Sequence, residues 1–167
     1  SQTDGVHNQG LEHYLRLVNV DSVVRTGPVM VAEEVTLGEA ARRMRESRRD
    51  AVVVTYADGG LGSLTERDLV GFVAERITGT PVGEVASRPL LTVPSGYSLL
   101  QVRRELQDRG IRHIGVVDDD GALMGLVGLQ DLLSGMELSY LQEVQEVFRE
   151  RDQALVEARR NLNLAEK

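Results

Sequence analysis

Apolar residues are spaced in two alternating ways along the chain, at helical intervals and in short runs. Residues 37–44 and 99–106 each carry an apolar stripe at intervals of three and four, which predicts a helix with one buried face. The members of the two stripes are Leu37, Ala40, Ala41 and Met44, and Leu99, Val102 and Leu106. Short apolar runs before the helices, at 29–31 and 90–93, and β-branched runs after them predict strands.

Turn and capping residues mark where these elements begin and end. Residues 57–60 and 119–121 contain Asp-Gly between apolar runs, which predicts two hairpins because both turn positions tolerate positive φ. A hydroxyl residue three positions before a carboxylate or amide predicts a capping box at each helix start. The pairs are Thr36 with Glu39 and Ser98 with Gln101. A last helix is expected to begin near Thr65 or Gly128 in each half, with apolar positions at Leu69, Val70 and Val73, and at Leu132, Leu133 and Met136.

The order strand–helix–strand–strand–helix therefore occurs twice, and the residues themselves repeat. The matching segments are 36–39 with 98–101, 51–54 with 114–117, and 62–69 with 125–132. The offset drifts from 61 at Pro28 and Pro89 to 63 at the last segments, as expected where loops gain or lose a residue. Each small sheet alone buries only one face, so the sequence predicts an α/β (α+β) fold of two βαββα repeats packed sheet to sheet.

Composition narrows the function classes. The chain has 167 residues, a net charge of −7, no cysteine or tryptophan, and three scattered histidines, His7, His13 and His113. The negative charge disfavours nucleic-acid binding. The absence of cysteine excludes disulfides and thiolate metal sites, and fits a cytoplasmic protein. No apolar run is long enough to predict a membrane span, and residues 1–10 are expected to form a flexible lead.

The duplication, the hairpins and the element Gly-x-x-Thr-x-x-Asp at residues 62–68 resemble a tandem pair of cystathionine β-synthase (CBS) domains, also called a Bateman module. The resemblance covers about residues 18–138. It implies pseudo-twofold symmetry and two clefts between the repeats that bind adenosine-containing ligands such as AMP, ADP, ATP or S-adenosylmethionine. We therefore expect residues 1–17 to form a lead, 18–80 the first repeat, 81–138 the second repeat, and 139–167 a signalling helix.

The resemblance also assigns residues to each cleft. The first cleft would use Thr65 and Asp68 from the first repeat, with Arg88, Pro89, Leu90, Arg112, His113 and Ile114 from the second. The second cleft would use Gly128 and Asp131, with Gly27, Pro28, Ala32, Arg49 and Asp50 from the first repeat.

The chemistry of these residues favours the first cleft. Free N–H groups at a helix start near Thr65 favour phosphate, and Asp68 can accept hydrogen bonds from ribose hydroxyls. Arg112, Arg88 and His113 can donate to phosphate. In the second cleft Gly128 replaces the hydroxyl residue, and Asp50 is expected to stand where the second repeat has His113, so a weaker or empty site is predicted. A purely structural role, in which Thr65 and Asp68 only cap a helix, remains the alternative.

Residues 137–166 contain no glycine or proline and predict one long helix. Apolar positions repeat at intervals of three and four, with an arginine among them, which predicts a parallel dimer seam. The seam is Leu141, Val144, Phe148, Arg151, Leu155, Ala158, Leu162 and Ala165. An amphipathic helix folded back on its own domain is the alternative. Residues 149–155 resemble linkers that precede PAS, GGDEF/EAL or kinase domains, which implies a sensory fragment of a longer bacterial protein.

Three functions can be compared on these residues. The favoured one is a ligand-sensing regulatory module that binds an adenosine-containing ligand and signals through the C-terminal helix of a homodimer to an output domain. The second is a dimerisation or scaffold module with no small ligand. An enzyme is disfavoured, because no nucleophile–base pair, metal-ligand cluster or phosphate-binding Walker loop is recognisable in the sequence.

Overall fold

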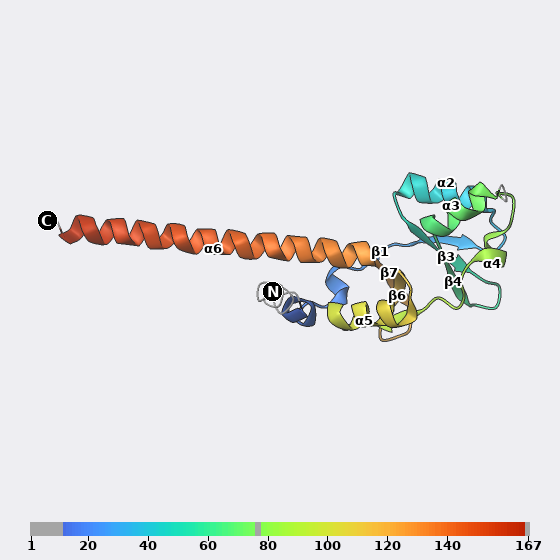
Figure 1. Cartoon of the computed structure of the whole chain (residues 1–167). Helices are drawn as coiled ribbons and strands as arrows, with labels where there is room; N and C mark the ends of the chain where they lie inside the picture. The colour runs from blue at the N-terminus through green and yellow to red at the C-terminus, as the bar shows by residue number, and fades with distance from the viewer. Residues whose placement is uncertain (1–11, 76–77, 166–167) are drawn as a thin grey trace.

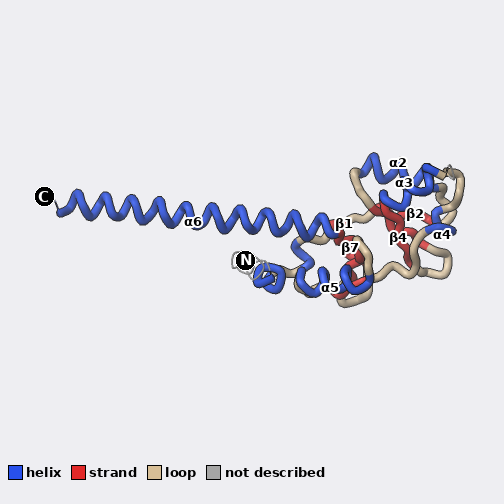
Figure 2. Tube along the Cα trace, in the orientation of Figure 1, coloured by secondary structure: helices blue, strands red, loops and turns tan. Residues whose placement is uncertain are grey.

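The computed structural model describes residues 12–75 and 78–165, and for residues 135–143 and 165 it describes the backbone alone. Two small α/β units lie side by side, and a long helix projects from one of them (Figure 1). The helices flank the two sheets on their outer sides (Figure 2). The expectations for residues 1–11, including His7 and the flexible lead, fall outside the described residues.

Both repeats have the predicted order of elements. The first consists of β2 (Val29–Ala32), α2 (Leu37–Ser47), β3 (Ala51–Thr55), β4 (Leu61–Thr65) and α3 (Glu66–Ala74). The short helix α4 (Val82–Val85) leads into the second, which consists of β5 (Thr92–Pro94), α5 (Leu99–Arg109), β6 (His113–Val117), β7 (Leu123–Gly128) and α6 (Leu129–Ala165). In each repeat the first two strands are parallel and the last two form an antiparallel hairpin.

The two sheets share a small apolar core. Val53 of β3 and Leu126 of β7 are buried in one cluster with Ala51 and Leu90, so this cluster draws on both repeats. Each repeat also has its own larger core between its sheet and its helices. The predicted packing of sheet on sheet is therefore confirmed, and it buries the sheet faces that the helices do not cover.

The repeats exchange their N-terminal segments. Strand β1 (Arg25–Thr26) pairs with β7 of the second repeat, so the second sheet has the order β1-β7-β6-β5. Upstream of β1, Leu15 and Val20, the first residue of the 3-10 helix η1 (Val20–Ser22), are fully buried in the second repeat's core. In return, Val82 of α4 is buried in the first repeat's core. The segment before the first repeat thus completes the core of the second repeat, and the segment before the second repeat completes the core of the first. This exchange ties the two units together.

The predicted burial of the apolar stripes is confirmed on helix faces that contact a sheet and is wrong on faces that do not. Leu37, Ala40 and Met44 of α2 are buried, as are Leu99, Val102 and Leu106 of α5. In α3 only Leu69 is buried, whereas Val70 and Val73 are 66% and 50% exposed. Leu132 of α6 is buried and Leu133 is exposed, and the side chain of Met136 lies outside the described ones. The exposed valines arise because α3 packs mainly against α2 and β4, which leave one side of it uncovered.

The two predicted capping boxes differ. Ser98 and Gln101 cap α5 reciprocally, side chain to backbone in both directions. In α2 the Thr36 hydroxyl accepts from the Glu39 N–H, but the Glu39 carboxylate turns to Arg42 and Arg43 instead of the cap. The box at Thr36 is therefore only half formed. The arginines lower the pKa of Glu39 from 4.5 to about 2.

The strand register corrects one predicted correspondence between the repeats. The N–H of Glu66 donates to the carbonyl of Asp50 at 2.8 Å, and the N–H of Leu129 makes the same bond to Arg112 at 3.0 Å. Asp50 is therefore equivalent to Arg112, and the match of 51–54 with 114–117 is wrong by one residue. The cause is an irregularity in the second hairpin, where Val116 and Val117 pair with Gly125 and Leu123 and leave Met124 as the extra residue.

Candidate functional site

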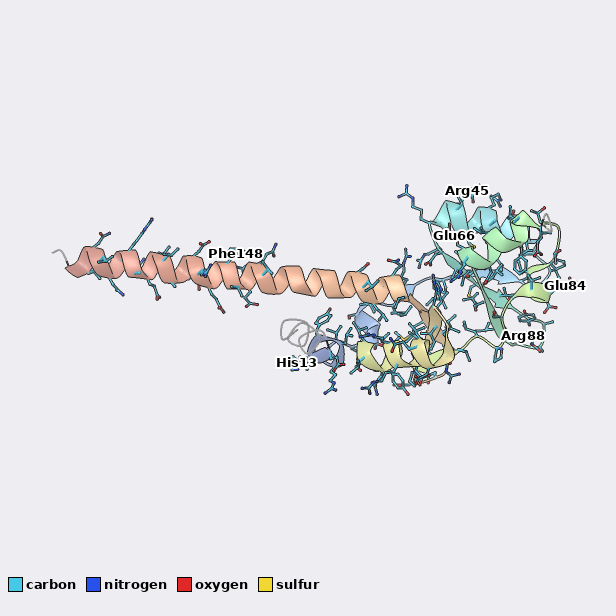
Figure 3. The ribbon with its side chains drawn as sticks, viewed as in Figure 1. His13, Arg45, Glu66, Glu84, Arg88 and Phe148 are labelled. Atoms are coloured by element: carbon cyan, nitrogen blue, oxygen red, sulfur yellow. The ribbon has the colours of Figure 1, made fainter. Side chains whose placement is uncertain are left out.

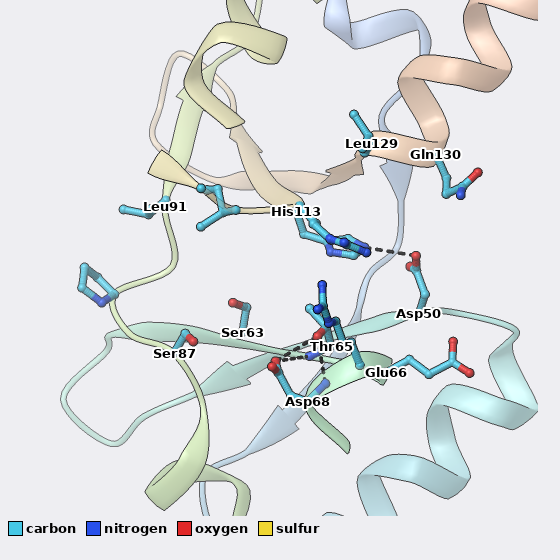
Figure 4. A pocket seen from close by; sticks show the side chains of 15 residues that line it. Asp50, Ser63, Thr65, Glu66, Asp68, Ser87, Leu91, His113, Leu129 and Gln130 are labelled. Atoms are coloured by element: carbon cyan, nitrogen blue, oxygen red, sulfur yellow. Dashed lines mark hydrogen bonds and ion pairs between the residues drawn. The ribbon is translucent and has the colours of Figure 1, made fainter. Parts of the chain in front are cut away.

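A cavity of about 560 Å³ lies between the two repeats (Figure 4). We call it the first cleft. One wall is the junction of β4 and α3, including Thr65 and Asp68. The opposite wall comes from the second repeat, from the loop after α5 and the start of α6, with His113 and Leu129. Its volume lies within the range of typical small-molecule sites, roughly 300–1,000 Å³.

Thr65 and Asp68 form a complete capping box at the start of α3. The Thr65 hydroxyl accepts from the Asp68 N–H at 3.3 Å. The N–H and the hydroxyl of Thr65 donate to the same Asp68 oxygen, Oδ2, at 3.0 and 2.9 Å. The box fixes the first turn of α3 at the cavity wall, where the helix dipole favours an anion. Asp68 keeps its second oxygen, Oδ1, outside these bonds.

Arg112 and His113 supply the basic side of the cleft. Nε2 of His113 lies 3.1 Å from Oδ2 of Asp50, a contact between the two repeats that Figure 4 marks with a dashed line. The His113 side chain is only 14% exposed, and its buried Nδ1 has no hydrogen-bond partner within the described residues. The Arg112 side chain is exposed, while its carbonyl accepts from the Leu129 N–H and so ties it to the start of α6.

Most, but not all, of the residues predicted for this cleft line it. Those that do are Thr65, Asp68, Pro89, Arg112 and His113. Leu90, upstream of β5, is buried between the sheets, and Ile114 of β6 is buried in the second repeat's own core. Leu91, next to Leu90, and Ile111, next to Arg112, line the cavity, and the sequence did not indicate either of them.

Arg88 is the clearest departure from the prediction, because it does not line the cavity. Its guanidinium pairs with Asp58 at 2.9 Å and lies 3.7 Å from the centre of the Tyr56 ring. The pKa of Asp58 is lowered by the N–H of Gly60 and then by Arg88. These contacts hold Arg88 on the first hairpin, as its position in Figure 3 shows. Its role is to attach the linker between the repeats.

The symmetry-related second cleft is almost closed, with a volume of about 10 Å³. Pro28, Arg49, Asp50 and Asp131 line it as predicted, whereas Gly27, Ala32 and Gly128 do not. Arg49 reaches across to donate to the Thr26 carbonyl at 2.9 Å.

The His113 ring occupies the space beside Gly128. A Cβ atom on Gly128 would lie 3.0 Å from both Cδ2 and Nε2 of that ring. A threonine equivalent to Thr65 would therefore require the ring to move by a few tenths of an ångström. Asp50 and His113 line both cavities, so their contact forms the partition between the two clefts.

The two clefts also differ in charge. Because Asp50 is equivalent to Arg112, the position that holds a cation in the first cleft holds a carboxylate in the second. This corrects the expectation that Asp50 stands in place of His113. Asp50 itself lines both cavities, so its carboxylate alone does not distinguish them. Asp131 still accepts from the Gly128 N–H at 2.8 Å, so the second cleft retains the capping carboxylate. Among the described residues, no group of three His, Cys, Asp or Glu could hold a metal ion, and no helix there could span a membrane.

Comparison with known proteins agrees with this architecture. The chain is 33% identical over 123 residues to the uncharacterised protein MK0525 of Methanopyrus kandleri, covering 71% of this chain and 63% of that one. It is 30% identical over 108 residues to the choline transport ATP-binding protein OpuBA of Bacillus subtilis, covering 65% of this chain and 28% of that one. It thus spans less than two thirds of the length of either relative.

The fold is also that of solved structures. The CBS domain protein PAE2072 of Pyrobaculum aerophilum, solved with AMP, superposes with a TM-score of 0.61 at 24% identity, over 68% of this chain and 89% of that one. The CBS domain family model matches residues 20–75 and 82–138, the two repeats described above. The chain therefore belongs to the CBS domain family and carries two CBS domains in tandem.

Proposed function

We propose that this chain is a regulatory module that binds an adenosine-containing ligand in the first cleft. The candidate ligands are AMP, ADP, ATP and S-adenosylmethionine. In this proposal the module catalyses no reaction and acts in the cytoplasm. Binding changes the angle between the repeats, and α6 passes that change to an output domain of the GGDEF/EAL, PAS or kinase type. A ligand can drive such a change only if it binds the two arrangements with different affinity.

The observation that carries the proposal is the pairing of opposite chemistries across the first cleft. Asp68 offers Oδ1 to the two vicinal hydroxyls of a ribose, which are hydrogen-bond donors. The α3 N-terminus and Arg112 favour phosphate, and Leu91 and Ile111 offer apolar surface to a base. Asp68 and Arg112 come from different repeats, so a ligand that contacts both bridges them.

Proteins similar in fold or sequence give further support. PAE2072 was solved with AMP, which indicates that this fold can accommodate an adenosine ligand. OpuBA is named as an ATP-binding transport protein, and this chain matches 28% of its length. That match is consistent with a module of this kind being joined to a separate functional part.

The proposed relay and homodimer rest on the exposed apolar surface of α6. Its 37 residues extend about 55 Å at 1.5 Å per residue, most of them beyond the second repeat (Figure 1). Phe148, Leu155 and Leu162 of the predicted seam are each at least 60% exposed. An isolated helix gains little from such a stripe in water, so we propose that the same helix of a second copy covers it.

A scaffold module with no small ligand is the second candidate. It is favoured by one observation, that the Thr65–Asp68 box is complete without any ligand. In that case Asp68 only caps α3, and its replacement affects stability alone.

Calorimetric titration of the whole chain with each of the four ligands tests the proposal. We expect saturable binding of at least one of them, with one ligand per chain because the second cleft is closed. An absence of binding by all four at millimolar concentration would contradict the proposal and favour the scaffold function. A ligand retained during purification would be identified by mass spectrometry after denaturation.

A further inference from the structure

The charged residues that line the first cleft give it no surplus of positive charge. Three carboxylates line it, those of Asp50, Glu66 and Asp68, against two guanidinium groups, those of Arg67 and Arg112. The four ligands proposed for this cleft differ in how many anionic groups they carry. AMP and S-adenosylmethionine each have one, a phosphate or a carboxylate, whereas ADP and ATP have two and three phosphates. The lining therefore bears directly on which of them binds.

Asp50 lies at the end of the cleft where a phosphate is expected. Its carbonyl accepts the N–H of Glu66, the first residue of α3, at 2.8 Å, so Asp50 is beside the helix N-terminus that favours an anion. Its carboxylate is directed at the His113 ring, as Figure 4 shows, with Oδ2 3.1 Å from Nε2. An anionic group at the start of α3 is therefore a neighbour of the Asp50 carboxylate.

The contact with Asp50 also limits what His113 offers to a ligand. Nε2 of the ring is directed at Asp50, and Nδ1 is buried without a hydrogen-bond partner among the described residues. A phosphate that binds this ring has to displace Asp50. Arg67 and Arg112 are thus the two basic side chains of the lining that can pair with an anion without such a change, and no ion pair of the described residues involves either of them.

The same contact limits the room for a chain of phosphates. Asp50 and His113 line the second cleft as well, where only about 10 Å³ is open. A di- or triphosphate that extends from the start of α3 towards the second cleft meets the Asp50 carboxylate and the closed space behind it. Each further phosphate adds a negative charge near that carboxylate, and no further cation lines the cavity to offset the repulsion.

The second repeat shows that the fold does not require a carboxylate at this position. Asp50 is equivalent to Arg112, because the carbonyl of each accepts the N–H of the first residue of the following helix. The Asp50 side chain is 46% exposed, and His113 is its one side-chain contact among the described residues. Its carboxylate is therefore a property of this chain and contributes little to packing, which points to a role for the charge itself.

We infer that Asp50 is a specificity-determining residue of the first cleft, which accepts an adenosine ligand with one anionic group and discriminates against di- and triphosphates. AMP and S-adenosylmethionine fit this requirement, and ADP and ATP do not. The inference rests on the proposed function and selects among its four candidate ligands. Arg112 and the start of α3 bind the single anionic group, and Asp50 disfavours any further one.

Calorimetric titration of the whole chain with the four ligands, at one ionic strength and without magnesium, tests this inference. AMP or S-adenosylmethionine should bind most tightly, and ATP should bind at least about tenfold more weakly than the tightest ligand. Asp50→Asn keeps the size of the side chain and an oxygen that can accept from His113. It should raise the affinity for ATP by about tenfold and that for AMP by less, so the preference narrows.

Two controls separate this role from general charge effects and from cation binding. Asp119→Asn removes one charge from the loop between β6 and β7, at the opposite end of β6 from His113, and should leave the preference unchanged. Titration with added magnesium chloride tests the opposite role, in which Asp50 attracts a cation that accompanies ATP. The preference for a single anionic group should persist under this condition.

The inference is overturned if ADP or ATP is the tightest ligand of the wild type, with or without magnesium, a result that does not depend on any variant. It is also overturned if Asp50→Asn leaves the preference unchanged, or if Asp119→Asn narrows it equally. In each of these cases a ligand still binds, so the proposed function stands. Absence of binding by all four ligands contradicts the proposed function and this inference together.

Discussion

Replacing Gly128 with threonine would test whether the His113 ring leaves room for a side chain at that position. The first repeat carries Thr65 at this position, so the change makes the two repeats alike. A Cβ on Gly128 lies 3.0 Å from two atoms of the His113 ring, closer than ordinary van der Waals contact, and the branched side chain adds two further atoms. The ring is 14% exposed and its Nε2 lies 3.1 Å from Asp50, so the movement that makes room for threonine strains this contact.

Overpacking of this kind costs about 1–3 kcal/mol. We therefore expect Gly128→Thr to lower the free energy of unfolding by that amount, and the melting temperature by several degrees. Urea denaturation followed by tyrosine fluorescence measures the first, and differential scanning calorimetry measures the second. Circular dichroism is less suitable here because α6 dominates the helical signal.

A double-mutant cycle with His113→Ala identifies the cause. Removal of the ring makes room for the threonine, so the double variant should be more stable than the sum of the single effects predicts, by about 1 kcal/mol or more. If the two effects add within about 0.5 kcal/mol, the ring does not exclude a side chain at position 128.

Three further predictions concern stability and assembly. Glu39 has a pKa lowered to about 2, first by Arg42 and then by Arg43, so its contribution to stability is present above pH 4.5 and is lost as the pH falls towards 2. Glu39→Gln should flatten the pH dependence of unfolding in that window, and unchanged slopes would contradict this. Gly125→Ala should cost about 3 kcal/mol in chemical denaturation, because its methyl group would collide with the Arg25 carbonyl and displace β1. Gly71→Ala, where a Cβ meets nothing, is the control and should stabilise by about 0.5–1 kcal/mol. Arg151→Leu removes a charge from the proposed dimer seam and should strengthen self-association at least tenfold in sedimentation equilibrium, while a monomer at every concentration would refute the seam.

Local signals in the sequence were sufficient to predict the order of the helices and strands. The capping residue Ser98, the Asp-Gly turns and the apolar stripes of α2 and α5 act over a few residues, and each acts where it was expected. The duplication then predicted sheet-on-sheet packing, because a single repeat leaves one sheet face uncovered.

Features that depend on distant contacts could not be predicted in this way. The pairing of β1 with β7 joins residues about a hundred positions apart, and no local pattern in Arg25 or Thr26 indicates it. Arg88 was assigned to a cleft, but it is drawn away by Asp58 and Tyr56, which lie about thirty positions earlier. The exact equivalence of Asp50 and Arg112 required the strand register, because an extra residue at Met124 shifts the alignment.

For the same reason, only some of the residues that line the first cleft could be predicted from the sequence. Thr65 and Asp68 belong to one local motif at a helix start, so their position at the cavity wall follows from sequence. Arg112 and His113 are brought opposite them only by the packing of the two repeats. The difference in volume between the clefts likewise depends on how the two repeats pack, which sequence patterns do not determine.

The most direct test of the account compares ligand binding by Asp68→Ala and Asp131→Ala. Each variant removes a carboxylate that accepts the N–H of the preceding cap residue, so the two should be destabilised alike, by about 1 kcal/mol. In calorimetric titration with whichever of AMP, ADP, ATP or S-adenosylmethionine binds the wild type, Asp68→Ala should lose at least tenfold in affinity, and Asp131→Ala should bind as the wild type does. Equal losses in both variants, or full binding by Asp68→Ala, would contradict the proposal that the first cleft is the ligand site.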